Sequence, residues 1–207
     1  MRLAGIILAG GMGTRMGTGL CPKQLLPLEG RPVLARVIEN GLAAGLDPLI
    51  LVLGHQAQPI IAGVMAGGMA AVDVSRVIVV VNPLYKTGMA SSIRVGLGAV
   101  GPCEGAMFLL GDQPLVDRPV LLKLIQAFSG SGIVMPTFQG RQGNPVIFGA
   151  EFFSQLQQLK GDRGGRVLFE AHGEQITRVP VETDGVCFDL DTPEDYSWLC
   201  QQKEIFS

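Results

Sequence analysis

The chain is poor in the residues that build metal frameworks and covalent catalytic sites. It has four cysteines and two histidines, and the cysteines (Cys21, Cys103, Cys187 and Cys200) are widely scattered, with no Cys-x-x-Cys pair. A structural zinc site or a disulfide framework is therefore not expected. No Ser-His-Asp or Cys-His arrangement can be argued from so few histidines, so the sequence does not indicate covalent catalysis.

Charge is also scarce, and neither sign dominates. Charged residues are 16% of the chain and the formal net charge is −2, whereas a nucleic-acid-binding domain is expected to be basic. No apolar run approaches the ~20 residues that cross a bilayer. The apolar stretch near the start is short and runs directly into a glycine loop, which is unlike a signal peptide. We expect a cytoplasmic protein that binds neither nucleic acid nor membrane.

Apolar residues, by contrast, are 47% of the 207 residues, enough for a core in one domain over residues 1–207. Continuously apolar runs, typical of strands buried on both faces, alternate with stretches of helical length. The predicted fold class is α/β, a three-layer α/β/α, Rossmann-like arrangement on a mostly parallel mixed sheet. Predicted strands cover 4–9, 49–53, 77–81, 106–110, 133–135, 146–148, 176–180 and 186–190. Predicted helices cover 33–44, 90–99, 119–128, 163–172 and 193–202, and residues 140–145 suggest a hairpin.

The first predicted strand ends in a glycine-rich loop, residues 10–17 (GGMGTRMG), followed by Pro22 and Lys23. Glycines let backbone N–H groups approach a bulky anion, and Arg15 and Lys23 supply the charge that phosphates require. The loop has no Gly-Lys pair of a P-loop. It misses the dinucleotide spacing by one residue, and residues 53–55 (LGH) lack the acid that a dinucleotide ribose needs. The loop favours a nucleoside triphosphate, with a ligand-free glycine turn as the alternative.

A carboxylate follows the fourth predicted strand, at the sheet edge where ligands bind. Asp112 fits a Mg²⁺ ligand, because Mg²⁺ takes one or two protein carboxylates together with phosphate oxygens. Its alternative role is a helix N-cap. Asp117 is better placed for that role, since Pro119 suits the first turn of the next helix.

A second acidic group follows at the end of the chain. At strand spacing Asp189 and Asp191 point to the same face, so one or both are candidates for the metal site. Thr192 and Pro193 resemble an N-cap and a first helical residue, with Asp195 in the first turn.

Three polar loops look suited to recognition, although each is also compatible with an ordinary surface turn. Residues 141–148 place polar groups on a turn before an apolar strand. Residues 161–166 (GDRGGR) carry one acid and two arginines into a predicted helix, whose start suits an anion. Ser91 and Ser92 follow Gly88 and are candidates for ligand donors or helix caps, with capping favoured.

These pieces together resemble the MobA-like nucleotidyltransferase family, and within it the molybdenum cofactor cytidylyltransferases. The matching segments are LAGGMGTRMG…PKQLLPLEGRPVL, GLDPLILVLGH, NPLYKTGMASSIRVGL, LLGDQPLV, GRQGNPVIF, KGDRGGR and DLDTPEDY, in the expected order over nearly the whole chain. The glycine loop alone would indicate only the wider nucleotidyltransferase class. The resemblance implies Mg²⁺-dependent attack of the terminal phosphate of Mo-molybdopterin on the α-phosphorus of CTP, with release of pyrophosphate.

The resemblance also implies roles for individual residues. The catalytic residues would be Arg15, Lys23 and Asp112. Nucleotide contacts would come from Leu8, Ala9, Gly10, Gly11, Gly13, Arg15, Lys23, Gly88 and Asp112. The metal ligands would be Asp112 with Asp189 or Asp191, and the pterin phosphate would face Gly143, Asn144, Pro145, Asp162 and Arg163. A molybdenum hydroxylase or its insertion chaperone would be the protein partner.

Several alternatives stay open at this point. The insert over residues 17–21 is longer than in the compact loop of cofactor cytidylyltransferases, and nothing in the sequence selects cytosine over guanine, so GTP is an alternative substrate. The acceptor could be another phosphorylated metabolite, such as a sugar or polyol phosphate. A non-catalytic molybdopterin-handling protein is a third reading, and a nicotinamide-dependent oxidoreductase is the least favoured.

Overall fold

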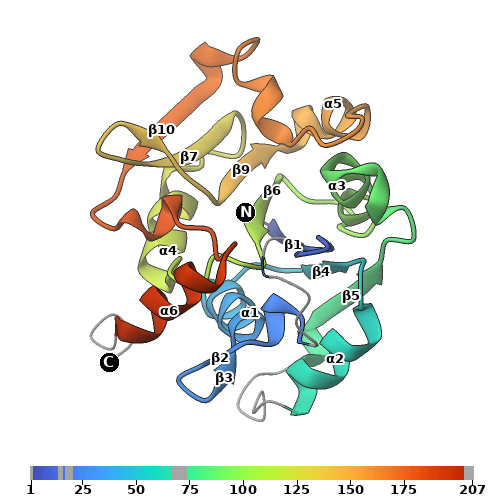
Figure 1. Cartoon of the computed structure of the whole chain (residues 1–207). Helices are drawn as coiled ribbons and strands as arrows, with labels where there is room; N and C mark the ends of the chain where they lie inside the picture. The colour runs from blue at the N-terminus through green and yellow to red at the C-terminus, as the bar shows by residue number, and fades with distance from the viewer. Residues whose placement is uncertain (1, 14–15, 17–20, 67–73, 203–207) are drawn as a thin grey trace.

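The computed structural model describes residues 2–13, 16, 21–66 and 74–202 of the chain. Its centre is an eight-stranded mixed sheet in the order β10-β7-β9-β6-β1-β4-β5, with the short β8 beside β7 (Figure 1). The strands are β1 (Leu3–Ala9), β4 (Leu49–Leu53), β5 (Val77–Val81), β6 (Gly105–Leu110), β7 (Ile133–Phe138), β8 (Arg141–Gln142), β9 (Val146–Gly149) and β10 (Ile176–Pro180).

Strand direction divides this sheet into two parts. In the first part β6, β1, β4 and β5 are parallel neighbours. In the second part β9 runs antiparallel to both β6 and β7, and β8 forms a hairpin with β7, as residues 140–145 predicted. Strand β10 is again parallel to β7. The loops after β1 and β6 therefore emerge side by side at one edge of the sheet.

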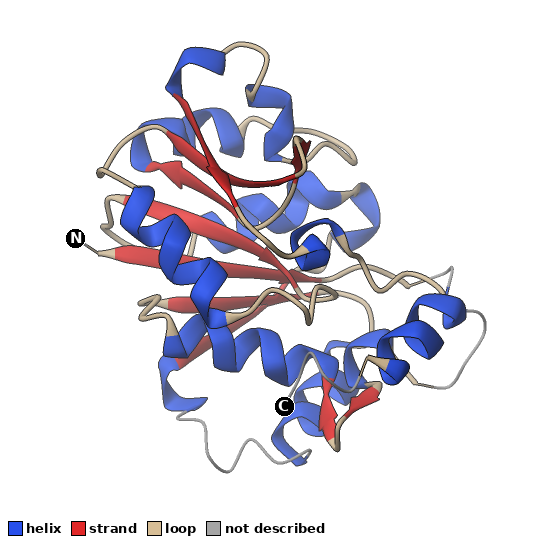
Figure 2. Cartoon of the chain, turned by 90° about the vertical axis from the view of Figure 1, so that its left-hand side faces the viewer, coloured by secondary structure: helices blue, strands red, loops and turns tan. Residues whose placement is uncertain are grey.

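Helices cover both faces of the sheet, which gives the predicted three-layer α/β/α fold (Figure 2). Alternate residues of β1 enter opposite layers: Ile7 packs with one group of helices and Ile6 with the other. Burial on both faces explains why β1 and β4 are continuously apolar. One layer contains α1 (Val33–Ala43), α2 (Ala57–Ala66) and α4 (Arg118–Ala127), and the other contains α3 (Met89–Leu97) and α5 (Phe153–Gln157).

A smaller apolar cluster lies beside these layers and supports the last polar segment. It joins α6 (Pro193–Gln201) to the hairpin of β2 (Pro27–Leu28) and β3 (Arg31–Pro32). Its buried members are Leu28, Val33, Leu115, Leu190 and Leu199. Because Leu190 is anchored in this cluster, the acidic residues on either side of it are held in fixed positions.

Two predicted elements are wrong. Residues 186–190 are not a strand: Asp184–Cys187 form a short 3₁₀ helix, and Val186 and Leu190 are buried without a strand ladder, which explains the misleading apolar signal. Residues 163–172 are not an α-helix. They contain only a 3₁₀ turn over Gly165–Leu168, since Gly165 packs closely against the Phe148 ring and glycine is a poor helix former.

The remaining predicted helices and strands are present, and their bounds differ from the expected ones by no more than three residues. Helices α2 and α5 were not predicted. The sequence of α2 is apolar almost throughout and ends near a glycine-rich patch, so it shows little amphipathic signal. No helix in the described part of the chain is long and apolar enough to cross a membrane.

Candidate active site

The candidate site lies where the loops after β1 and β6 meet. The parallel register pairs Leu8 of β1 with Leu110 of β6, and the Gly111 N–H donates to the Leu8 carbonyl. The glycine loop and Asp112 therefore leave the sheet next to each other. This is the carboxyl end of parallel strands, where ligands bind in open α/β sheets.

Lys23 reaches this edge from a short 3₁₀ helix, Lys23–Leu25. The helix is attached to the end of β1 by Gln24, which is 3% exposed and donates from Nε2 to the Ala9 carbonyl at 3.3 Å. Sequence reasoning did not identify Gln24, although its place directly after Lys23 in the quoted motif was a usable signal. Its amide fixes the backbone from which the Lys23 side chain extends.

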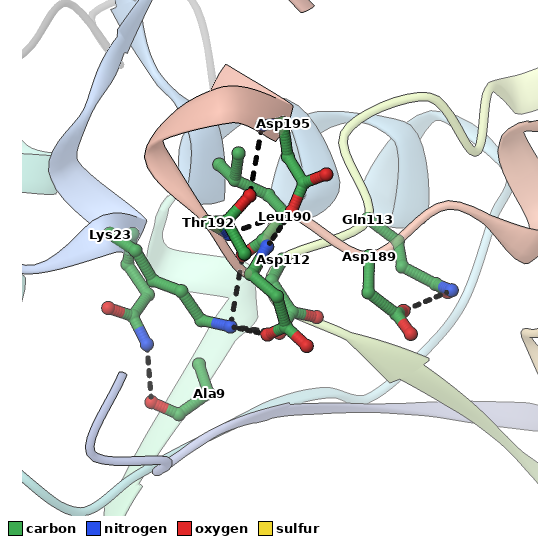
Figure 3. Close-up of polar contacts among 10 residues, drawn as sticks. Ala9, Lys23, Asp112, Gln113, Asp189, Leu190, Thr192 and Asp195 are labelled. Carbon is green, nitrogen blue, oxygen red and sulfur yellow. Dashed lines mark hydrogen bonds and ion pairs between the residues drawn. The ribbon is translucent and has the colours of Figure 1, made fainter. Parts of the chain in front are cut away.

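The Lys23 ammonium binds two carboxylates (Figure 3). Its Nζ lies 2.5 Å from Asp112 Oδ2 and 3.0 Å from Asp191 Oδ1, and it donates to the Leu190 carbonyl at 3.2 Å. Burial by itself lowers the pKa of Lys23, but the charges and hydrogen bonds of the two aspartates outweigh it, so the pKa lies above its ordinary value. Lys23 therefore keeps its positive charge, beside the glycine loop.

Asp189 and Asp191 do not lie on a strand, contrary to the prediction, but both line the larger of two cavities at this edge together with Asp112. Asp191 forms an ion pair with Lys23. Asp189 instead accepts a hydrogen bond from Gln113 Nε2 at 2.8 Å (Figure 3). Burial raises the pKa of Asp189, and the negative charge of Asp112 raises it further, while the Gln113 hydrogen bond acts in the opposite direction. Gln113 was missed by sequence reasoning, although it directly follows Asp112.

A helix start holds Asp191 in place. Thr192 caps α6 by accepting from the Asp195 N–H at 3.1 Å, and Asp195 Oδ2 accepts from the backbone N–H groups of Thr192 and Asp191. This capping box confirms the predicted N-cap. Asp117 is likewise confirmed as the cap of α4, which leaves Asp112 free of a capping role.

The donor set suits a divalent cation that arrives with its substrate. Among the described residues no three His, Cys, Asp or Glu side chains are arranged to hold a metal ion by themselves. Asp112 and Asp191 nevertheless converge on one point, the Lys23 ammonium, and both offer the hard oxygen ligands that Mg²⁺ and Mn²⁺ prefer. Since Mg²⁺ usually takes one or two protein carboxylates and completes its shell with water and phosphate, these residues fit it.

Two adjoining cavities surround this cluster, with volumes of about 570 and 340 Å³. Both are lined by Leu8, Gly11, Met12, Asp112, Asp162 and Asp191. Of the residues expected to contact nucleotide, all that are described line one or both: Leu8, Ala9, Gly10, Gly11, Gly13, Lys23, Gly88 and Asp112. Arg15 lies outside the described residues. The volumes are in the range of small-molecule sites.

The glycines of the loop serve different purposes. A Cβ at Gly11 would meet nothing within 4 Å, so its backbone faces open cavity, whereas Gly13 has a φ of +60° that favours glycine. Gly88, with a φ of +104°, is needed for a different reason, because a Cβ at this position would overlap the Gly161 carbonyl group. Gly88 therefore lets the loop over residues 161–164 dock against α3.

Asp162 completes this docking. Its Oδ1 accepts from the Met89 N–H at 3.1 Å, and the Ala90 N–H donates to the Gly161 carbonyl at 3.1 Å. The cap of α3 thus comes from a distant loop. Ser91 and Ser92, expected as caps, are instead buried and accept hydrogen bonds from Asn82 Nδ2.

A third cavity, about 220 Å³, lies on the far side of Asp162 and has mainly apolar walls. Two of the residues expected to face the acceptor, Asn144 and Asp162, line it. Arg166, which sequence reasoning passed over in favour of Arg163, also lines it and donates from Nη2 to Asn144 Oδ1 at 3.2 Å. The other three candidates, Gly143, Pro145 and Arg163, are not among the residues that line this cavity.

Comparison with known proteins identifies the group to which these features belong. Residues 5–176 match the model of the MobA-like NTP transferase domain. A nicotine blue oxidoreductase from Paenarthrobacter nicotinovorans is 26% identical over 93% of both chains. The bifunctional protein GlmU of Pelobacter propionicus is 30% identical over 80% of this chain, but the match covers only 33% of that longer protein.

Solved structures agree with the fold. The crystal structure of Rv0371c from Mycobacterium tuberculosis has a TM-score of 0.81 and 32% identity and covers 97% of both chains. The manganese complex of Rv0371c has a TM-score of 0.78, 30% identity, and coverage of 98% of this chain and all of the other. A nucleotidyl transferase from Methanothermobacter thermautotroptrophicus has a TM-score of 0.81 and 23% identity, and the match covers 97% of this chain and 96% of the other. At this identity the similarity supports the fold alone.

Proposed function

The chain belongs to the MobA-like NTP transferase domain family, and from this premise we propose that it is a molybdenum cofactor cytidylyltransferase. It would join the cytidine monophosphate unit of CTP to the terminal phosphate of Mo-molybdopterin. One observation carries the nucleotidyl-transfer part of the proposal: the Lys23 ammonium, held between Asp112 and Asp191, lines the cavity formed by the glycine loop. The choice of CTP and Mo-molybdopterin rests on the resemblance of the sequence motifs.

The reaction follows from this charge arrangement. An oxygen of the acceptor phosphate forms a bond to the α-phosphorus while the bond from that phosphorus to pyrophosphate breaks. Lys23 offsets the negative charge of the leaving phosphates, and the open backbone at Gly11 gives them room. No covalent intermediate is needed, so the absence of a nucleophile motif in the sequence is consistent with this chemistry.

A divalent cation fits the same site. When bound with the triphosphate, Mg²⁺ would neutralise phosphate charge, and its protein ligands would be Asp112 and one of Asp189 and Asp191. Asp191 is the better candidate, because it shares the Lys23 contact with Asp112, whereas Asp189 is engaged by Gln113. The manganese complex of Rv0371c supports a divalent ion in proteins of this fold.

Pyrophosphate release tests the proposal. Purified protein with Mg²⁺ is given CTP, GTP, ATP or UTP, each with and without Mo-molybdopterin. CTP-dependent release that requires the pterin is the expected result. Preference for GTP would reassign the base, and release with a sugar or polyol phosphate instead would reassign the acceptor. No release with any pair, together with retained molybdopterin binding, would favour a non-catalytic handling protein.

Oxidoreduction is a second candidate, favoured by the 26% identity to a protein named an oxidoreductase. The site gives it little support, because β4 is followed by Gly54 and His55 rather than by the acidic residue that binds a nicotinamide ribose. Titration with NADH and NADPH, monitored by cofactor fluorescence, separates the two activities. Tight binding of either one would overturn the transferase assignment.

A further inference from the structure

Three oxygen atoms surround the Lys23 ammonium, and we call this group the oxygen cage. The Lys23 Nζ contacts Asp112 Oδ2, Asp191 Oδ1 and the Leu190 carbonyl, at 2.5, 3.0 and 3.2 Å. The side chain is 9% exposed. Two carboxylates and a carbonyl are the donor types that hard divalent cations take. The ammonium thus lies where the donor set would suit a metal ion.

The cage does not depend on Lys23 alone for its shape. The Leu190 N–H donates to the Asp112 backbone carbonyl at 3.0 Å, which ties the two acidic segments together. Leu190 is itself fully buried, and Asp195 fixes the Asp191 backbone from the start of α6. The backbone positions of Asp112, Leu190 and Asp191 are therefore held by contacts that do not involve the lysine.

The cavity beside the glycine loop offers the Lys23 side chain a second position. The stem of this side chain lies beside the glycine loop: a Cβ built on Gly13 would be 3.8 Å from the Lys23 Cγ. Lys23 and Gly13 line the same cavity of about 340 Å³, together with Gly11. Rotation of this flexible stem would bring the ammonium to phosphates bound at the glycine loop, where a compact positive charge is attracted strongly.

We propose that Lys23 occupies the divalent metal position in the nucleotide-free protein and excludes the metal ion until a nucleoside triphosphate draws the ammonium away. An ammonium and a divalent cation cannot share these oxygens, because like charges a few ångströms apart repel strongly in a partly buried site. The nucleotide then supplies both the new partner for Lys23 and the remaining metal ligands. This inference rests on the proposed nucleotidyl transfer and concerns the order in which its site assembles.

Metal binding without any reaction tests the proposal. Mn²⁺ affinity of the nucleotide-free protein is measured by the electron paramagnetic resonance signal of free Mn²⁺. Lys23→Met keeps much of the length of the side chain but removes its charge. This variant should bind Mn²⁺ at least about tenfold more tightly than the wild type, because Mn²⁺ no longer competes with an ammonium group for the two carboxylates. Adding Asp191→Asn to Lys23→Met should cancel the gain.

Lys86→Met is the matched control. Lys86 lines the larger cavity and lies 5.9 Å from the Tyr85 ring centroid, so its loss removes one positive charge from the same region without touching the cage. It should change Mn²⁺ affinity far less than Lys23→Met does. An equal gain in both variants would mean that general electrostatics is responsible, and the proposal would be overturned.

Folding is checked by circular dichroism, and Lys23→Gln provides a second uncharged variant if Lys23→Met does not fold. In either folded variant Mn²⁺ should raise the melting temperature more than in the wild type. Unchanged Mn²⁺ affinity and melting shift in the variant would overturn the proposal. The proposed function is tested separately with a non-hydrolysable CTP analogue. This analogue should make the wild type bind Mn²⁺ whether or not Lys23 excludes the metal ion from the nucleotide-free protein. If the analogue does not promote Mn²⁺ binding, the result counts against nucleotidyl transfer itself.

Discussion

The two sides of the candidate site are built differently. The charged side, where we propose that the nucleotide binds, lies at the ends of the parallel strands β1 and β6 and carries the cluster of Lys23, Asp112 and Asp191. The other side lies beside the antiparallel β9 and the loop over residues 161–166, and its cavity is mainly apolar. The difference suggests a division of work, with charge for the phosphoryl chemistry on one side and shape for acceptor selection on the other.

The Asp162 loop joins these two sides. Asp162 lines all three cavities and is anchored to α3 through the Met89 N–H. The division can therefore be tested by changing one residue on each side and one at the junction. If it is correct, variants on the charged side lower the rate at saturating substrate, and variants on the apolar side raise the KM of the acceptor.

The largest effect is expected from Asp112→Asn on the charged side. The amide is similar in shape but loses the negative charge that binds Lys23 and suits the metal ion. Pyrophosphate release at saturating substrates should fall by about 10²–10³, the usual cost of removing one electrostatic contact in an active site. Asp117→Asn is the control, because asparagine caps a helix as well as aspartate does. A wild-type rate in Asp112→Asn would remove the charged side from catalysis.

Gly88→Ala tests the junction. The added methyl group would overlap the Gly161 carbonyl, and the φ of +104° is strained for alanine. We expect loss of about 1–3 kcal/mol of unfolding free energy from this strain. The displaced loop should also raise the acceptor KM, measured by steady-state kinetics.

Gly101→Ala separates the two causes of that effect. Gly101 has a φ of +64°, but a Cβ there meets nothing within 4 Å. It should lose stability from the backbone strain and keep the wild-type KM. Equal KM changes in both variants would show that loop docking at Gly88 has no special role.

Arg166→Gln tests the apolar side. Arg166 lines this cavity as a basic side chain opposite in charge to Asp162, and it donates one hydrogen bond to Asn144. Loss of a hydrogen bond to a charged group predicts an acceptor KM about tenfold higher, with the nucleotide KM and the maximal rate unchanged. The same substitution at Arg163, which does not line this cavity, should have a smaller effect. A larger effect on the acceptor KM at Arg163 than at Arg166 would favour Arg163, the residue selected from the sequence.

The smallest effect is expected from Thr192→Ala, which removes the cap of α6 behind Asp191. Such a cap contributes about 1 kcal/mol, so the melting temperature should fall by roughly 2–4 °C while activity changes little. Ser197→Ala, on the same helix, removes only a hydrogen bond to the Pro193 carbonyl. A melting temperature unchanged by Thr192→Ala would indicate that the core contacts of Leu190 and Leu199 hold α6 without its cap.

The sequence alone determined the layered fold class, seven of the strands of the main sheet, and the placement of the glycine loop and Asp112 at the ligand-binding edge. These follow from local signals. Continuous apolar runs indicate buried strands, and parallel strands bring the residues that follow them to one edge. The caps Asp117 and Thr192 were also predictable, because capping involves residues within three positions of each other.

Only the tertiary structure decided which polar groups meet. Lys23 contacts Asp191 across 168 positions, and Asp162 caps α3 across 73, so neither pairing leaves a periodic signal in the chain. Asp189 and Asp191 were assigned to a strand because buried Val186 and Leu190 imitated one, and only the folded chain gives the two carboxylates different partners, Gln113 and Lys23. Apolar burial fixes where a segment lies, but backbone pairing fixes where its side chains point, and that pairing is set by the rest of the fold.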